Sequence, residues 1–105
     1  MVFRPEALAQ LEELYDFVSD AGSPDIAADF TEAIVAFCES LTDFPLRGTA
    51  RDDLRPGLRI IGFRKRVVLA YAIIGQTIAI IGVFYGGRDH ERILRSGDYI
   101  AADPD

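Results

Sequence analysis

The predicted architecture follows from residues 58–85, LRIIGFRKRVVLAYAIIGQTIAIIGVFY. Two short links, Arg64-Lys65-Arg66 and Gly75-Gln76, divide this stretch into three apolar runs: 58–63, 67–74 and 77–85. Parallel strands need a crossover of about a dozen residues or more, so links this short predict an antiparallel meander of three strands. Gly75 opens the second link, which favours a type II′ hairpin turn.

Two amphipathic helices are expected before this sheet. Apolar residues recur at helical spacing after Pro5, which predicts a helix over 5–21 that Gly22 ends. Ser23 and Pro24 are suited to begin a second helix, which ends before the Phe-Pro pair at 44–45. Because the joint between the helices is so short, they are expected to form an antiparallel hairpin.

The segments outside these elements complete the predicted fold. Residues 2–4 can form only a stub of strand at one edge, and residues 46–56 are expected to be a loop. The fold class is therefore α+β, with the helical hairpin packed on an antiparallel sheet of three to four strands. Residues 1–95 are expected to be a single domain, and residues 96–105 an acidic, flexible tail.

The sheet carries no alternation of apolar and polar residues, so both of its faces are apolar. Two helices cover one face, and two alternatives remain for the other. A partner chain covers it, or the loop and the C-terminal segment do so. We favour the partner chain.

Charge is divided unevenly along the chain, although the net charge is −6. Residues 1–46 hold one basic and ten acidic residues, whereas residues 47–95 hold ten basic and four acidic residues. Attraction between the two halves is one explanation, but surface ion pairs stabilise little, so we favour a functional basic face. The acids of the two helices are expected to form an ordinary solvated surface: Glu12, Glu13, Asp16, Asp20, Asp29, Glu32 and Glu39.

Most signatures of catalytic and metal sites are missing from the sequence. It has no phosphate-binding loop, nucleophile elbow or dinucleotide fingerprint. Cys38 lies on the apolar side of a helical repeat and is predicted to fill the core, and the single histidine, His90, does not predict a metal site. No cofactor is expected. The longest apolar runs have eight residues and no secretory signal is present, so we expect no membrane span and a cytoplasmic location.

What remains is a set of cations in the second half of the chain. Arginine binds carboxylate and phosphate bidentately, so these residues favour an anionic partner, either an acidic protein surface or a nucleic acid. The set comprises Arg47, Arg51, Arg55, Arg59, Arg64, Lys65, Arg66, Arg88, Arg92 and Arg95.

Several motifs in this order are similar to a known family. They are RPEALAQLEELYDF at 4–17, FPLRG at 44–48, DLRPGLR at 53–59, the strand at 67–71, and VFYGGRD at 83–89. Together they resemble the ParE/RelE superfamily of toxins from type II toxin–antitoxin systems, and the ParE branch more closely. The resemblance implies a toxin that a cognate ParD-like antitoxin neutralises and that inhibits DNA gyrase. The RelE branch, a ribosome-dependent mRNA endonuclease, is the alternative.

The two branches imply different roles for the same residues. On the ParE reading no residue is catalytic, and Arg88, Arg92 and Arg95 contact the target. The antitoxin then meets Arg59, Phe63, Arg64, Arg66, Tyr71, Phe84 and Tyr85. On the RelE reading a metal-independent endonuclease uses Arg66 and Arg88 to stabilise charge and His90 to transfer protons. Leu94 stands where that branch carries a tyrosine, so an enzyme and direct nucleic-acid binding are the less favoured alternatives.

Overall fold

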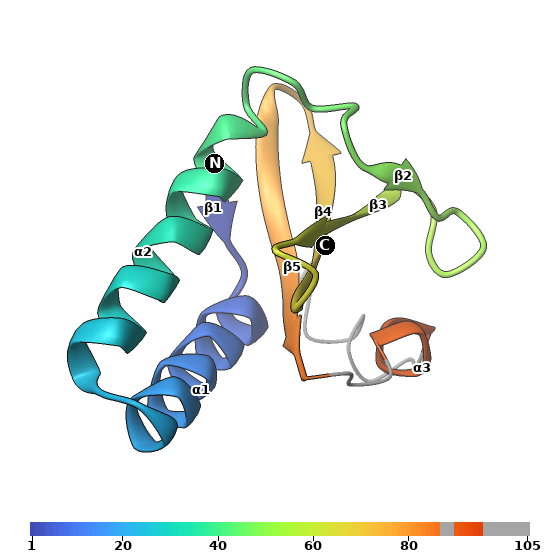
Figure 1. Ribbon diagram of the computed structural model, residues 1–105. Coiled ribbons are helices and arrows are strands. Elements are labelled where there is room, and N and C mark those ends of the chain that lie inside the picture. Colours follow the sequence, from blue (N-terminus) through green and yellow to red (C-terminus); the bar gives the residue numbers. More distant parts are fainter. Residues whose placement is uncertain (87–89, 96–105) are drawn as a thin grey trace.

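The computed structural model describes residues 1–86 and 90–95 and places a helical hairpin against one face of a five-stranded sheet (Figure 1). Arg88 and the predicted tail, residues 96–105, lie outside the described residues. Within the described residues, no helix is long and apolar enough to cross a membrane.

Helices α1, Pro5–Ala21, and α2, Pro24–Ser40, form the hairpin. Each begins with a proline, whose fixed φ suits the first helical turn and whose missing N–H would have no partner there. The side chain of Ser23 caps α2 by accepting a hydrogen bond from the Ile26 backbone N–H at 3.2 Å. The bounds of α1 confirm the prediction, and α2 ends at Ser40, before the Phe-Pro pair.

The sheet contains five strands in the order β1-β5-β4-β3-β2. They are β1 Val2–Phe3, β2 Thr49–Ala50, β3 Leu58–Phe63, β4 Val67–Ile74 and β5 Thr77–Tyr85. The bounds of the meander β3-β4-β5 confirm the prediction, and Gly75 has a positive φ of 64°, as a type II′ turn requires.

Two predictions about the sheet edges were wrong. The predicted loop contains β2, which pairs antiparallel with β3 through only two residues and so has no periodicity in the sequence. The stub β1 pairs parallel with β5, so the sheet is not entirely antiparallel. Each edge strand is therefore fixed by its neighbour and not by a signal of its own.

The first core lies between the helical hairpin and the sheet. It includes Cys38, which is fully buried as predicted, and burial raises the pKa of its thiol to about 12. Its other buried members are Ala7, Leu14, Ile34, Leu41, Val67, Leu69, Tyr71, Ile78, Ile80 and Val83.

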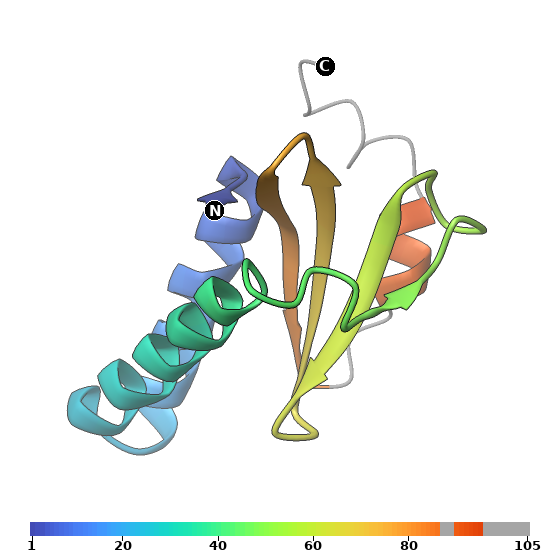
Figure 2. The ribbon, with the colours of Figure 1, turned by 90° about the horizontal axis from the view of Figure 1, so that it is seen from above.

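The opposite face of the sheet has a second core, which corrects the expectation that a partner chain covers it. Helix α3, His90–Arg95, lies across this face and buries Leu94, while the loop after β2 buries Leu54 beside it (Figures 1 and 2). These two leucines pack with sheet residues that include Phe84. The chain therefore covers both apolar faces with its own side chains.

Candidate functional site

A row of aromatic rings runs from the tip of the helical hairpin past the ends of β5 and β3. Neighbouring ring centroids are 5.4 Å apart for Phe17 and Tyr85, and 6.1 Å apart for Tyr85 and Phe30. They are 6.3 Å apart for Phe30 and Phe63, and 5.0 Å apart for Phe63 and Phe37. All four distances suit favourable aromatic pairs. We call these five side chains the aromatic row.

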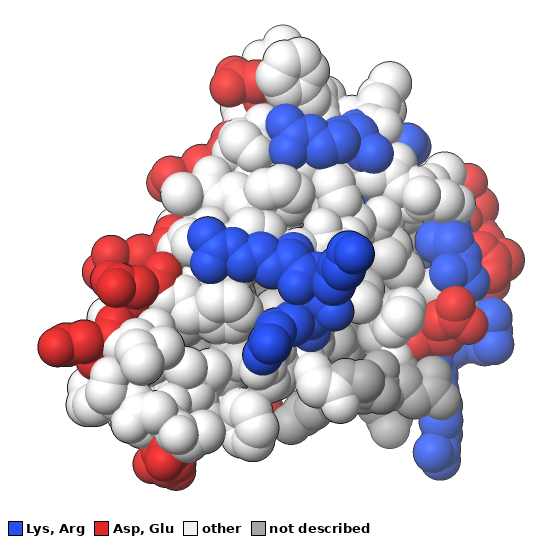
Figure 3. Space-filling view, in the orientation of Figure 1, with Lys and Arg blue, Asp and Glu red and all other residues white. Residues whose placement is uncertain are grey.

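Guanidinium groups lie over the same rings. The Arg64 guanidinium is 4.9 Å from the centre of the Phe63 ring. That of Arg47 is 5.4 Å from the Phe37 ring and 5.5 Å from the Phe44 ring. Figure 3 shows Lys and Arg side chains over the middle and top of this face, with Asp and Glu side chains along its margins. The face therefore combines aromatic surface with positive charge, which suits an acidic, apolar partner.

The turn between β3 and β4 places its cations in a strained backbone. Arg64 and Lys65 have positive φ angles of 53° and 59°. This conformation costs an L-residue about 1 kcal/mol or more, and hairpins normally use Asn or Gly for it. The side chains of Lys65 and Arg66 form no ion pair with any described residue. Local stability therefore does not account for this choice of residues.

The loop over residues 44–48 is held to the sheet by two side chains. The Tyr71 hydroxyl donates to the Pro45 carbonyl at 2.8 Å and accepts from the Gly48 N–H at 2.9 Å. The Arg59 guanidinium donates to the Gly48 carbonyl at 2.6 Å and to that of Leu46 at 3.1 Å. The anchored loop nevertheless presents apolar surface to solvent, since Leu46 is 69% exposed. Phe44 in the same loop is 64% exposed.

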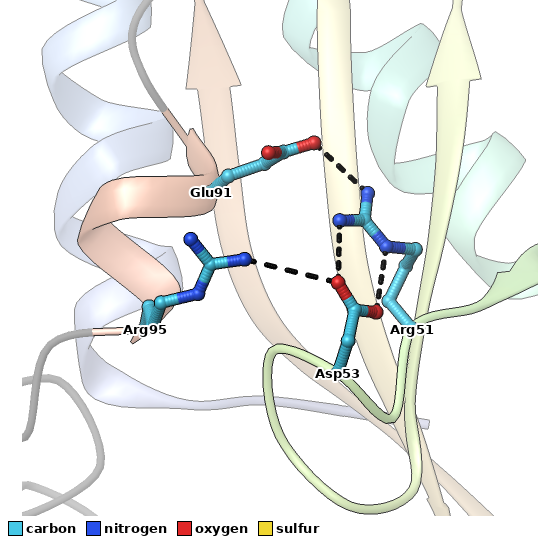
Figure 4. A network of polar contacts seen from close by, with 4 residues as sticks. All are labelled: Arg51, Asp53, Glu91 and Arg95. Atoms are coloured by element: carbon cyan, nitrogen blue, oxygen red, sulfur yellow. Dashed lines mark hydrogen bonds and ion pairs between the residues drawn. The ribbon is translucent and has the colours of Figure 1, made fainter.

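A network of ion pairs joins α3 to the loop after β2 (Figure 4). Arg51 contacts Glu91 on α3 at 3.0 Å, and Asp53 in its own loop at 2.9 Å and 3.0 Å. Arg95 lies 3.8 Å from the same Asp53 carboxylate. The hydrogen bonds from Arg51 hold the pKa of Asp53 below its ordinary value. The network thus fixes α3, and with it Arg92 and Arg95, on the sheet.

No three His, Cys, Asp or Glu side chains in residues 1–86 and 90–95 lie together in a way that could hold a metal ion. The ring of His90 packs 6.1 Å from that of Phe84. The described surface is thus organised for contact and not around a metal.

Comparison with known proteins agrees with this picture. Residues 1–90 match the family model for the ParE toxin of the type II toxin–antitoxin system, parDE. The chain belongs to the ParE toxin family. Its fold is similar to a solved structure described as the chromosomal ParDE TA system from P. aeruginosa, with a TM-score of 0.70 and 21% sequence identity over 80% of this chain and 91% of that chain. No curated protein matches the sequence. The predicted superfamily, its ParE branch and the α+β fold are confirmed.

Two residues expected to bind an antitoxin in this ParE-family chain are not on its surface. Tyr71 is fully buried in the first core and Phe84 is buried in the second. Successive residues of a strand face opposite sides, and both sides of this sheet are covered, so an apolar strand residue gives no indication of exposure. Arg59 is half-buried and supports the 44–48 loop.

The other expected antitoxin contacts lie together on the face of the aromatic row. Arg64 and Arg66 are exposed, whereas Phe63 and Tyr85 are half-buried. The sequence analysis missed the exposed ring of Phe17, which follows Tyr15 and precedes Val18 on the apolar stripe of α1. An aromatic residue beside such a stripe, near the end of a helix, was the available signal.

Proposed function

We propose that this ParE-family toxin acts in the cytoplasm by binding DNA gyrase, and that a ParD-like antitoxin neutralises it. The family assignment supports the toxin role and implies a partner of this kind. The observation that carries the binding proposal is the aromatic row with its overlying cations. Exposed aromatic and arginine side chains are enriched where proteins meet, and charge around them selects the partner.

The antitoxin is proposed to cover the aromatic row with an acidic, amphipathic segment. Arg64 and Arg66 at the β3-β4 turn and Arg47 at the other end supply positive charge along this face. The apolar surface between them includes Phe17 and Phe44, which are both exposed. A segment with carboxylates on its rim and apolar side chains at its centre would match this arrangement.

The target is proposed to contact the C-terminal arginines. Arg92 and Arg95 are exposed on α3, and Arg88 belongs to the same proposal from the resemblance. Arg51 holds α3 through Glu91, which keeps these side chains in a defined position on the sheet. Binding to a fixed cationic helix requires no reaction, so the proposal makes the toxin an inhibitor and not an enzyme.

The mRNA endonuclease alternative, with Arg66, Arg88 and His90 as its site, has less support. Leu94 occupies the position at which the RelE resemblance places a tyrosine, and Leu94 is buried in the second core. A side chain at this position would face the sheet and not a substrate. An acidic chain also lacks the positive field that helps a protein to bind RNA.

Two assays on the purified chain separate these functions. In a gyrase supercoiling assay we expect inhibition, and we expect the double variant R92A/R95A to lose it while Lys65→Ala retains it. Lys65 is a matched control because it is an exposed cation at the β3-β4 turn and not on α3. In a translating-ribosome assay we expect no mRNA cleavage. Cleavage that Arg66→Ala abolishes, with gyrase unaffected, would refute the proposal.

A further inference from the structure

A recess opens at one end of the aromatic row, between the tip of the helical hairpin and the ends of the strands. Its volume is about 280 Å³. Apolar side chains from α1, α2 and β5 form its walls, and two guanidinium groups from the β3-β4 turn stand at its rim. The lining residues are Val18, Ile26, Phe30, Tyr85, Arg64 and Arg66.

The apolar wall of this recess is open to solvent. Ile26 is 57% exposed, and so is Phe17, which packs edge-on against the Tyr85 ring at 5.4 Å. Both lie near the joint between the two helices, where the chain could place polar residues without disturbing either core. Exposed apolar side chains that converge on one recess are typical of an anchor point for a partner.

The rim of the recess is positive and lacks a counter-charge. No acidic residue lines it. Arg66 forms no ion pair with any described residue, and the contact printed for Arg64 is with the uncharged ring of Phe63. Both guanidinium groups therefore keep the capacity to bind a carboxylate bidentately.

The backbone of the turn supports a binding role for these cations independently of exposure. Arg64 and Lys65 adopt positive φ angles that Asn and Gly would adopt with less strain. A strained backbone that keeps charged residues is a reason to look for a function at that point. Here the charge is held directly beside the apolar recess.

We propose that this recess anchors a large apolar side chain of a partner polypeptide that carries a carboxylate beside it. The recess lies at the small end of the range for ligand pockets, so it accommodates one side chain and not a larger ligand. The carboxylate pairs with Arg64 and Arg66. The inference deepens the proposed function and rests on it, because it states what the antitoxin segment presents at this end of the aromatic row.

The probes for this site are N-acetyl-L-phenylalanine and its primary amide, which share one apolar side chain and differ in the carboxylate. Each is titrated into the full chain while two-dimensional NMR follows the methyl groups of Ile26 and Val18 and the ring of Tyr85. We expect these signals to shift with the acid at millimolar concentration. The amide is expected to bind about fivefold more weakly, which corresponds to the upper end for an exposed ion pair.

Three variants assign the difference to the rim. Arg64→Gln and Arg66→Gln are each expected to reduce the preference for the acid over the amide. Lys65→Gln is expected to leave it unchanged, since Lys65 lies in the same turn but does not line the recess. Backbone amide spectra of the free variants check that each one is folded, and either arginine variant alone suffices for the test.

The outcomes distinguish this inference from the proposed function. Equal binding of acid and amide, or shifts confined to other surfaces, would overturn the anchor site even if the chain inhibits gyrase. A short single-stranded RNA that displaces the acid from Ile26 and Tyr85 would assign the recess to nucleic acid and overturn it too. Selective binding of the acid by a chain that does not inhibit gyrase would retain the anchor site and refute the proposed target.

Discussion

Tyr71→Phe is predicted to destabilise the fold by about 2 kcal/mol, because a single hydroxyl ties the 44–48 loop to the sheet. Its oxygen accepts from the Gly48 N–H at 2.9 Å and donates to the Pro45 carbonyl at 2.8 Å. Tyr71 is fully buried and Gly48 is also buried, so water does not replace the lost partner of the Gly48 N–H. An unsatisfied buried donor costs about 1–3 kcal/mol, and Arg59 still holds the Gly48 carbonyl.

Urea unfolding measures this loss. The midpoint is expected to fall while the slope stays constant, and Tm is expected to fall by roughly 10 °C for a domain of this size. Tyr15→Phe is the matched control, since it removes the same atom from a half-exposed side chain on α1 and should change stability by less than about 0.5 kcal/mol. Equal losses in the two variants would refute the idea that the Tyr71 hydroxyl anchors the loop.

Four further predictions test other parts of the structure. Leu94→Ala should cost about 3 kcal/mol in urea unfolding, since it empties the contact between α3 and the second core; a loss below about 1 kcal/mol would mean that α3 is not packed there. The pKa of Asp53 is lowered in the fold, so its contribution to stability is present above the ordinary value of 3.8 and is lost as the pH falls through the lowered pKa; Asp53→Asn should remove this acid dependence from unfolding curves. Replacing Arg64-Lys65 by Asn-Gly should raise stability by about 1 kcal/mol, because these residues accept positive φ, while weakening binding of N-acetyl-L-phenylalanine; unchanged stability would show that the turn is unstrained. Burial raises the pKa of Cys38 to about 12, so Ellman's reagent should modify it only after unfolding, and rapid reaction of the native chain would contradict its place in the core.

The helices and the meander were predictable because their signals are local. Pro5 and Pro24 begin the two helices, and Gly75 occupies the one turn position that needs a positive φ. Strand direction followed from link length alone, since links of two and three residues leave no room for a crossover. Each of these inferences needs only neighbouring residues, which is the information that a sequence displays directly.

The edges of the sheet and the cover of its second face depend on contacts between distant residues. The strand β2 exists because residues 49 and 50 pair with β3, and the loop before it is tied to Tyr71. Leu54 and Leu94 meet on the sheet although forty residues separate them in the chain. An apolar residue in a loop or a short helix does not indicate which face it covers, so the sequence left two alternatives open and the less favoured one was correct.

The candidate site shows the same limit. The resemblance selected Tyr71 and Phe84 along with Tyr85, but only Tyr85 reaches the aromatic row, because the other two face cores that the chain itself closes. Phe17 and Phe30 join Tyr85 only after the chain reverses at Gly22 and the sheet returns to the hairpin tip. Charge was the more reliable guide, since Arg64 and Arg66 are exposed where the sequence analysis placed a basic face.

The position of the two surfaces limits how neutralisation could work. The aromatic row lies on the helical side of the sheet, whereas Arg92 and Arg95 project from α3 on the other side. A partner segment confined to the row would therefore leave the C-terminal arginines accessible. If both parts of the proposed function hold, the antitoxin must continue past a sheet edge or around the strand ends to reach α3. A segment truncated to the part that covers the row should then bind the toxin and leave gyrase inhibited, whereas relief of inhibition by that segment would show that the target uses the aromatic row itself.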